Sequence, residues 1–598
     1  MPFVDSRRLT GSNLFFASTG AVLDVVGVAI DEELLAAWRR RVERAGARLA
    51  WVDRQSAVRA HAGGVLLAIS APGDQLLLAT EVNEWALCAA LVERDPKRWA
   101  GLNEALIAAA LDSADDGTNP AVEFAPVVEE SAALARFRRL AAVEAVPGML
   151  ALLGVAAARA LPHFIDDTEL TLGAGAGSRS FALRELPSVA AVSWNELSDI
   201  PTAIVTGSNG KTTTVRLIAA CARAQGWRAG YNCTDGVFIG AETVATGDYS
   251  GPAGARLVMR DRRTQAAILE AARGGILRRG LAVARADAAV VTNISSDHFG
   301  EYGIDDLAGL ADVKLSVAAA VAADGRLILN ADDPLLRMKS SELAQRYGRR
   351  PALAWFALDA DQSHLRQFRL QGASTCGVRH GRLCLHHSGS EYDLGAVLSM
   401  PLSIGGIAIY NVANLAAAAL AAITLGIPAA LIAAVFARFG ERMSDNPGRM
   451  MRFEFNGVHV LIDYAHNPDG LRGFLSVANQ LRGSTSRLGL LLGHAGNRKD
   501  TDIAELARVA AGFMPELVVV KEDEAHLRGR APGEIPRIIR DELLRLGLAE
   551  SALPVRDTEL EAARFALRWA QPGDVLALPL HSPSARAAVV AILENKIG

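Results

Sequence analysis

The residues best suited to chemistry in this chain form a glycine loop between an apolar run and a helix. Residues 204–214 read Ile-Val-Thr-Gly-Ser-Asn-Gly-Lys-Thr-Thr-Thr. The run before the loop is typical of a buried strand, so unpaired backbone N–H groups and the positive end of the helix dipole meet at the turn. Lys211 can reach the outer phosphates of a nucleotide, and Thr212 can hold Mg²⁺. The loop therefore predicts a phosphate site.

This loop departs from the full phosphate-loop pattern at one position. The pattern has a glycine at position 205, where the chain has Val205. The alternative is an ordinary glycine turn that caps a core helix. The strand, turn, lysine and helix nevertheless follow in the right order, which favours the phosphate site.

Polar residues also follow several later apolar runs. Short apolar runs that alternate with helices predict parallel strands, and the carboxyl ends of such strands meet at one edge of the sheet. Three of the runs end in Glu270, in Asn293 with Asp297 and His298, and in Asn330 with Asp332 and Asp333. Their convergence on one edge predicts a nucleotide and metal site.

The composition is that of a soluble globular protein with about three or four domains. Among 598 residues, 62 are basic and 66 acidic, and this near balance indicates neither a nucleic-acid nor an anionic membrane partner. The five cysteines are scattered without a C-x-x-C pair, which is typical of reduced thiols. The amino terminus lacks a cationic segment followed by an apolar one, and no apolar run is long enough to span a membrane. These observations predict a cytoplasmic protein.

The expected fold class is α/β, in three parts. Residues 1–165 are predicted to form an α+β module, and residues 166–199 a linker. Residues 200–446 are predicted to form a parallel-sheet domain with a phosphate loop, which carries a small antiparallel sheet at about 350–405. Residues 447–598 alternate apolar runs with helices, which predicts a smaller Rossmann-like domain.

Three local patterns outside the loop carry weaker predictions. Glu81 and Glu84 could be catalytic carboxylates, but acids at the start of a helix near Thr80 are the stronger interpretation. The glycine-rich stretch 173–178 predicts a flexible connection. The adjacent His386 and His387 would point to opposite faces of a strand, so a shared metal is not expected.

Taken in order, the motifs resemble those of the Mur ligase superfamily, and within it the Mur-like part of the cyanophycin synthetases. The resemblance runs from about 200 to 598, and residues 7–14 and 79–85 are more loosely similar to the first domain of cyanophycin synthetases. The motifs that carry it are Gly207–Thr213, Thr234–Gly236, Glu270–Leu277, Thr292–His298, Lys314, Asn411 with Asn414, Pro447–Met450 and Asp463–Pro468. Cyanophycin synthetases also have an ATP-grasp ligase domain between their first domain and the Mur-like part. The stretch 166–199 is too short to hold it, so one of the two ligation activities is missing.

The resemblance implies an ATP-dependent ligase that activates a carboxylate as an acyl phosphate and joins it to the amine of an amino acid. The catalytic residues would be Lys211, Glu270, His298 and Lys314. The magnesium ligands would be Thr212, Glu270 and His298, with Lys314 if that lysine is carbamylated; an unmodified Lys314 would make a charge contact to phosphate. The nucleotide would be bound by Gly207, Ser208, Asn209, Gly210, Lys211, Thr212, Thr213, Asn411, Arg449 and Asp463.

Substrate recognition is expected at Asp235, Arg256, Arg260, His466 and Asn467, with solvated surface charges as the alternative for the two arginines. The substrates would be an amino acid and a peptide or cyanophycin-like carboxylate. A separate ATP-grasp ligase could act in trans, and a homo-oligomer is expected. Two alternatives stay open: another Mur or folylpolyglutamate-type ligase, and a non-catalytic nucleotide-binding partner of an ATP-grasp ligase.

Overall fold

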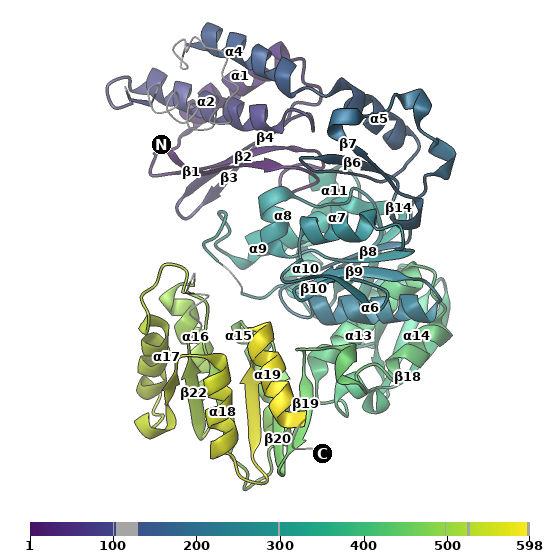
Figure 1. Cartoon of the computed structure of the whole chain (residues 1–598), viewed down its shortest axis with the longest axis vertical. Helices are drawn as coiled ribbons and strands as arrows, with labels where there is room; N and C mark the ends of the chain where they lie inside the picture. Colours follow the sequence, from purple (N-terminus) through teal and green to yellow (C-terminus); the bar gives the residue numbers. More distant parts are fainter. Residues whose placement is uncertain (100, 103–128, 297–298, 497, 523–526, 595–598) are drawn as a thin grey trace.

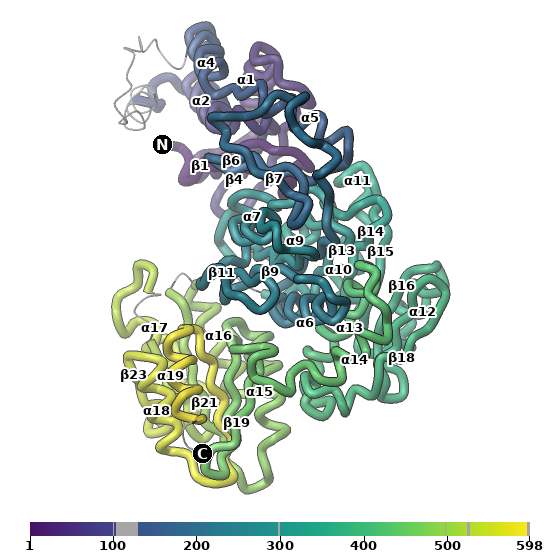
Figure 2. Tube along the Cα trace, turned by 45° about the vertical axis from the view of Figure 1, so that its right-hand side comes forward, coloured from purple at the N-terminus to yellow at the C-terminus, as the bar shows by residue number. Residues whose placement is uncertain are grey.

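The computed structural model describes residues 1–99, 101–102, 129–296, 299–496, 498–522 and 527–594. It has a mixed α/β fold, as predicted, with a parallel-rich sheet at its centre. The N-terminal module and the C-terminal domain lie at opposite ends of the middle domain (Figure 1), and a view from a second side has the same order (Figure 2).

The N-terminal module packs helices on one antiparallel sheet of order β1-β2-β4-β3. Its core includes Trp38 and Trp85, both buried. The strands are β1 (Phe3–Leu9), β2 (Gly20–Val26), β3 (Ser56–His61) and β4 (Gly64–Ser70), and the helices on this sheet are α1 (Glu32–Arg48), α2 (Leu76–Arg94) and α4 (Glu130–Glu144). Helix α5 (Pro147–Ala158) packs instead on a separate small core formed with residues 170–197. Among the described residues no single helix is long and apolar enough to cross a membrane, although the bent pair α4 and α5 passes that test when the two are taken together.

Helix α2 begins earlier than the sequence predicts. Its first residue is Leu76, so Glu81 lies inside the helix and not at its positive end. The N-terminus of α2 takes its acid from another helix: Glu144 accepts hydrogen bonds from the N–H groups of Leu77 at 2.8 Å and Leu78 at 2.9 Å. Glu81 pairs instead with Arg136 at 2.6 Å. The prediction of a helix start near Thr80 is therefore wrong.

Residues 163–182 form an ordered antiparallel sheet of three strands, and short 3-10 helices follow up to residue 196, where the sequence predicts a flexible linker. The strands are β5 (His163–Ile165), β6 (Glu169–Leu172) and β7 (Arg179–Ala182). Arg260 of the middle domain fixes this sheet, because its guanidinium pairs with Asp166 and donates to Thr171 Oγ1 at 2.9 Å. Ala176 N also donates to Thr264 O at 2.8 Å, so the glycine-rich stretch is ordered by contacts to distant residues.

In the middle domain, one sheet of eleven strands runs in the order β11-β10-β9-β12-β8-β13-β14-β15-β16-β17-β18. The strands from β9 to β16 in this order are parallel. The eleven strands of the sheet are β8 (Thr202–Thr206), β9 (Ala229–Cys233), β10 (Gly236–Ile239), β11 (Glu242–Thr246), β12 (Ala266–Glu270), β13 (Ala286–Val291), β14 (Val321–Asn330), β15 (Leu353–Asp359), β16 (Ser374–Arg379), β17 (Arg382–His387) and β18 (Ser390–Ala396). Because β8 lies between β12 and β13, the chain changes direction across the sheet there, which is where α/β proteins bind ligands.

Residues 350–405 do not form a separate sheet. Strands β15 and β16 extend the parallel part of the central sheet, and only β17 and β18 are antiparallel to their neighbours. Helix α12 (Ser363–Leu370) includes Phe368, in a run that the sequence suggests is a strand. Phe368 stacks on Trp355 of β15 with ring centroids 4.2 Å apart, and this packing favours the helix.

Helices cover both faces of the central sheet. One face packs on α6 (Lys211–Ala224), α13 (Ile409–Thr424) and α14 (Ala429–Phe436). The other face packs on α7 (Pro252–Arg260), α8 (Arg273–Arg279), α9 (Leu307–Lys314), α10 (Pro334–Lys339) and α11 (Leu343–Tyr347). Because both faces are buried, the parallel strands are mostly apolar; the exceptions include Asn232 in β9 and Glu270 at the end of β12.

The C-terminal domain has a six-stranded sheet of order β19-β20-β24-β21-β22-β23 with helices on both faces. Only β19 is antiparallel to its neighbour. The strands are β19 (Met451–Phe455), β20 (Val458–Asp463), β21 (Leu488–Leu492), β22 (Leu517–Lys521), β23 (Val555–Arg556) and β24 (Val575–Pro579), and the helices are α15 (Pro468–Leu481), α16 (Asp500–Ala511), α17 (Glu534–Arg545), α18 (Glu559–Trp569) and α19 (Pro583–Glu594).

Candidate functional site

The glycine loop joins β8 to α6 and has a backbone that only glycine allows at two positions. Gly207 has φ 144° and Gly210 has φ 84°. A Cβ at Gly207 would lie 1.8 Å from Thr292 Oγ1, and one at Gly210 would lie 2.2 Å from Asn414 Oδ1. The first N–H groups of α6 have no partner within the helix. The loop is therefore shaped to hold an anion at its helix end.

Residues just after β13 hold the loop in this shape. Ser208 N donates to Asn293 O at 3.0 Å, and Asn209 N donates to Asn293 Oδ1 at 3.0 Å. Thr292 Oγ1 donates to Asn209 O at 2.6 Å, and Ser208 Oγ donates to Ser295 O at 2.9 Å. Residues 292–295 thus hold the glycine loop in place through hydrogen bonds.

Lys211, Thr212 and Glu270 meet at the start of α6. Lys211 Nζ donates to the carbonyl oxygens of Gly207 and Ser208, both at 3.1 Å, so the side chain lies over the loop. Thr212 Oγ1 donates to Glu270 Oε2 at 2.8 Å. Burial raises the pKa of Glu270, and the charge of Lys211 partly offsets this. A hydroxyl and a carboxylate are the oxygen donors that Mg²⁺ prefers, so this pair fits that ion.

The C-terminal side of the chain reaches the loop through Arg449. Its guanidinium lies 3.4 Å from Thr212 Oγ1 and 4.4 Å from the ring centroid of Tyr464. Asp463 accepts a hydrogen bond from Met450 N at 2.7 Å, which fixes the backbone next to Arg449. Burial raises the pKa of Asp463, while Arg449 opposes the rise. In this structure Asp463 positions Arg449.

Asn467 makes a second contact between the domains. Its Nδ2 donates to Asn209 Oδ1 at 3.0 Å, and its Oδ1 accepts from Gly470 N at 2.8 Å as the N-cap of α15. The adjacent His466 lines the cavity described next, and its Nδ1 lies 3.2 Å from Tyr464 O. The loop and the C-terminal domain are therefore joined by hydrogen bonds to both Asn209 and Thr212.

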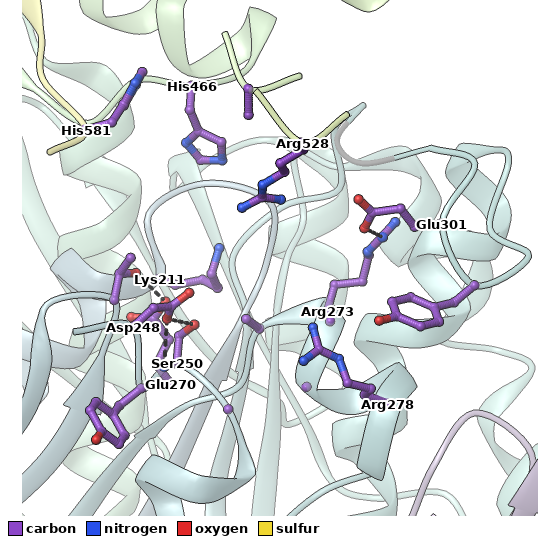
Figure 3. Close-up of a pocket in the computed structure, with 18 of the residues that line it drawn as sticks. Lys211, Asp248, Ser250, Glu270, Arg273, Arg278, Glu301, His466, Arg528 and His581 are labelled. Atoms are coloured by element: carbon purple, nitrogen blue, oxygen red, sulfur yellow. Dashed lines mark hydrogen bonds and ion pairs between the residues drawn. The ribbon is translucent and has the colours of Figure 1, made fainter. Parts of the chain in front are cut away.

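A cavity of about 1080 Å³ opens in front of the loop. Figure 3 shows Lys211, Asp248 and Glu270 on one side, Arg273 and Arg278 on another, and His466, Arg528 and His581 above them. Residues of the N-terminal module, Asp5 and Asp24 among them, also line it. All three parts of the chain thus meet at one cavity, which is large enough for a nucleotide and a second substrate.

Several predicted site residues make structural contacts instead of lining the cavity. Asp235 accepts from Arg216 and from Arg586 of α19, each at 2.7 Å. Asn411 is buried and donates to Leu402 O at 3.1 Å. Arg260 is engaged by the β5–β7 sheet.

Two more predicted loop or metal residues can be placed. Thr213 Oγ1 accepts from Asn446 Nδ2 at 3.2 Å. Lys314 ends α9, is only 2% exposed and lines the cavity. Asp297 and His298 lie outside the described residues.

Asp248 lies in the site without having been singled out in the sequence. It lines the cavity beside Glu270 (Figure 3), and its charge helps to raise the pKa of Glu270. Its carboxylate accepts from Ser250 N at 3.0 Å and Ser250 Oγ at 2.6 Å. The signal in the sequence is the run Gly-Asp-Tyr-Ser at 247–250, an aspartate turn in a loop after an edge strand.

A charged network supports the part of the cavity formed by the C-terminal domain. Lys521 at the end of β22 pairs with Glu559, and both side chains are 3% exposed. Glu559 accepts from the N–H groups of His581 at 3.0 Å and Ser582 at 2.9 Å. His581 Nε2 lies 3.1 Å from Ala465 O, which assigns a proton to that nitrogen. Burial and Lys521 lower the pKa of His581 to about 3, so the ring is neutral at pH 7.

Acidification is expected to loosen this network. The unfolded chain protonates His581 near its ordinary pKa of about 6.5, and the folded chain does so only near 3, so stability falls as pH drops through this window. The opening free energy of β20 and β24 should fall by roughly 1 kcal/mol per pH unit between pH 6 and 5. Hydrogen exchange read by mass spectrometry measures it. His581→Asn should flatten the dependence, whereas the exposed His459→Asn should not; equal slopes in all three proteins would contradict this account.

Comparisons with known proteins identify two family domains in this chain. The Mur ligase middle domain family matches residues 205–422, and the Mur ligase glutamate ligase domain family matches residues 448–578. Cyanophycin synthetase of Crocosphaera subtropica is 35% identical over 347 residues, which are 58% of this chain but 38% of that protein. The UDP-N-acetylmuramoyl-L-alanyl-D-glutamate--2,6-diaminopimelate ligase of Chlorobium phaeobacteroides is 28% identical over 388 residues, 62% of this chain and 69% of that protein.

The solved structures that match are more distant. A bifunctional folylpolyglutamate synthase/dihydrofolate synthase with Mn, AMPPNP and L-glutamate bound has 17% identity and a TM-score of 0.46, over 66% of this chain and 89% of that one. The match to the cyanophycin synthetases covers well under half of their length, 38% in the two compared.

Proposed function

Because this chain belongs to the Mur ligases by its middle and C-terminal domains, we propose that it is an ATP-dependent ligase that forms an amide bond. It joins the amine of an amino acid to a carboxylate of a peptide-like acceptor, in the manner of a cyanophycin synthetase. The observation that carries the proposal is the meeting at Thr212, where Glu270 lies 2.8 Å and Arg449 of the C-terminal part 3.4 Å from one hydroxyl at the phosphate loop.

The proposed reaction has two steps. A carboxylate oxygen of the acceptor attacks the γ-phosphorus of ATP, the bond to the β-phosphate oxygen breaks, and ADP leaves. The amine nitrogen then attacks the carbonyl carbon of the acyl phosphate, loses a proton, and expels inorganic phosphate. Both steps depend on positioning and on neutralising phosphate charge, since the protein supplies no covalent group.

The side chains around the loop suit these needs. The N–H groups at the start of α6 bind phosphate oxygens, and Lys211 turns from the loop carbonyls toward the outer phosphate. Thr212 and Glu270 would hold Mg²⁺, which neutralises phosphate charge when bound. Arg449 adds a positive charge from the C-terminal domain, so closure of that domain on the loop completes the site.

Lys314 and His298 belong to the same proposal. Lys314 is buried at the cavity, and carbamylation would turn its cation into an anion able to hold a second Mg²⁺ together with His298. Intact-mass measurement before and after acid treatment would detect a labile carbamate.

The proposal extends to partners. The missing ATP-grasp domain favours a separate ATP-grasp ligase in trans, which would make the acceptor that this chain modifies. A homo-oligomer and a cytoplasmic location complete the proposal, and the five free cysteines suit that compartment.

Phosphate release tests the function. The full chain is incubated with ATP, Mg²⁺, each amino acid in turn and a panel of short acidic peptides. Release is expected only when an amine and a carboxylate acceptor are both present, with a product whose mass is that of the two substrates less one water. EDTA should abolish release.

A defined negative result favours the alternative function. Binding of ATP without turnover, for every acceptor and also with a purified ATP-grasp ligase added, would indicate a non-catalytic nucleotide-binding partner. Turnover on folate or on a peptidoglycan precursor alone would indicate the other Mur-type activities.

A further inference from the structure

The wall of the cavity made by α7 and α8 differs in charge from the rest. Arg256 of α7 and Arg278 and Arg279 of α8 line it. None of the three has an ion-pair partner among the residues that the structure describes. We call these three residues the arginine wall. Figure 3 shows Arg278 of this wall apart from Lys211 and Glu270.

The nearby acids do not neutralise the arginine wall, because they have other partners. Asp5 pairs with Arg7, Asp24 with His61 at 3.0 Å, and Glu301 with Arg273 at 2.6 Å. These acids come from the N-terminal module or from the loop after β13. Asp166 and Asp167, the acids that act on Arg256, also have other partners, Arg260 and Arg8.

Within the arginine wall, Arg256 and Arg279 are partly buried, and Arg278 is exposed to solvent. Burial is the largest cause that lowers the pKa of Arg256; the charges of Arg260 and Arg279 add to it, and the nearby Asp166 and Asp167 oppose it. Arg256 is half-buried, and its neighbour Arg260 already has Asp166 as a partner. A guanidinium placed this way gains most from a carboxylate or phosphate, which it binds through two parallel N–H bonds.

The N-terminal module fixes the helix that carries the arginine wall. Arg7 Nε donates to Leu277 O at 3.0 Å, and Thr10 N donates to Arg279 O at 2.7 Å. Leu281 N donates to Ser12 O at 2.7 Å, just after the helix ends. These bonds hold both the last turn of α8 and the segment after it. The module thus gives Arg278 and Arg279 a fixed place in the cavity.

From these observations we infer that the arginine wall binds a second acidic group of the acceptor, beyond the carboxylate that is activated at the phosphate loop. This inference rests on the proposed ligase function and names its substrate class: an acceptor with several carboxylates, or with a carboxylate and a phosphate. An acceptor with a single acidic group would bind at the phosphate loop without contacting the arginine wall.

Calorimetric binding of synthetic peptides tests the arginine wall without any need for turnover. The probes, all with an acetylated N-terminus and an amidated C-terminus, are a tetra-aspartate peptide, the same peptide with three aspartates changed to asparagine, and that asparagine peptide with one phosphoserine added. We expect the wild-type chain to bind tetra-aspartate or the phosphoserine peptide at least tenfold more tightly than the single-acid peptide. Whichever of the two binds identifies the second group as carboxylate or phosphate.

Substitutions then locate the binding. The pair Arg256→Gln with Arg278→Gln should weaken the multiply acidic peptide roughly tenfold or more and leave the single-acid peptide unchanged. Arg278→Lys should retain part of the affinity, since lysine keeps the positive charge but cannot make the bidentate hydrogen bonds of a guanidinium. Arg366→Gln, on the exposed face of α12, is the matched control and should bind like wild type.

Two results would overturn the inference. One is equal binding of all three peptides to the wild-type chain, or binding of none of them. The other is unchanged binding of the multiply acidic peptide by the double variant. If phosphate release fails while these binding differences appear, the ligase function is wrong and the arginine wall remains an anion site. If phosphate is released but the binding differences do not appear, the ligase function stands and the inference about the arginine wall is wrong.

Discussion

Replacing Lys211 with alanine is expected to lower ATP-dependent phosphate release roughly 100- to 1000-fold, the usual cost of removing one charge-stabilising donor from a transition state. The side chain lies over the loop, with Nζ 3.1 Å from the carbonyl oxygens of Gly207 and Ser208. In the proposed reaction it moves from these oxygens to the phosphate being transferred. Steady-state phosphate release with saturating amino acid and acceptor measures the loss.

Stability should change little in this variant, so the two effects can be separated. Lys211 makes two bonds to loop carbonyls, but Thr292, Asn293 and Ser295 make bonds to the loop that do not involve Lys211 and that persist in the variant. The melting temperature of Lys211→Ala should therefore stay within a few degrees of wild type. Lys97→Ala, an exposed lysine in the N-terminal module, is the matched control for activity. Full turnover by Lys211→Ala would rule out the proposed mechanism.

The sequence predicts the loop well because its glycines, its lysine and the start of the helix after it are adjacent in the chain, although residues 292–295 also hold its shape from a distance. Gly207 and Gly210 are required by backbone angles of the loop itself, and Lys211 and Thr212 begin the helix that follows. The alternation of strands and helices likewise predicts the α/β fold, since each apolar run is buried on both faces. The pairing of Thr212 with Glu270 follows from parallel strands ending at one edge.

The errors fall where distant residues decide the outcome. The stretch 173–178 has the composition of a flexible connection, but Arg260 and Thr264 order it from elsewhere in the chain. The start of α2 depends on Glu144, which is distant in sequence. These partners cannot be identified from the local sequence pattern, because the composition of a segment does not show which distant residues pack against it.

The influence of distant residues also explains why the sequence predicts only one member of the arginine wall, Arg256. The sequence suggests Arg256 and Arg260 as a pair of substrate residues, yet Arg260 holds the β5–β7 sheet. Arg278 and Arg279 take the place of Arg260 at the cavity, where the N-terminal module fixes α8. Whether a residue such as Arg260 can contact a substrate thus depends on the residues that surround it in the folded chain.

Asp235 is the second residue whose replacement should have a large effect, and the effect is expected on stability. Its carboxylate is 14% exposed and pairs with Arg216, which is 3% exposed, and with Arg586, which is 11% exposed. Burial favours the neutral acid, but Arg449, Arg216 and Arg586 outweigh it and hold the pKa of Asp235 below its usual value. Asp235→Asn leaves two guanidinium groups without their anion.

Removing one partner of such a buried group of charges costs about 3–5 kcal/mol of unfolding free energy. Urea unfolding of the full chain at pH 7 measures it. Arg586→Gln should cost much less, because Arg216 still pairs with Asp235 and still donates to Pro447 O at 2.8 Å. Arg452→Gln, an exposed arginine in β19, should leave the unfolding free energy unchanged.

This prediction also decides between two roles for Asp235. The family resemblance implies a substrate contact, in which case Asp235→Asn would raise KM for the amino acid while stability stays near that of wild type. The buried pairing implies the opposite result, a large loss of stability. The lowered pKa of Asp235 in the folded chain also predicts a pH dependence. Its contribution to stability is fully present above its ordinary pKa of 3.8 and is lost as pH falls through the lower folded value, so the difference in stability between wild type and Asp235→Asn should narrow as pH falls below 3.8.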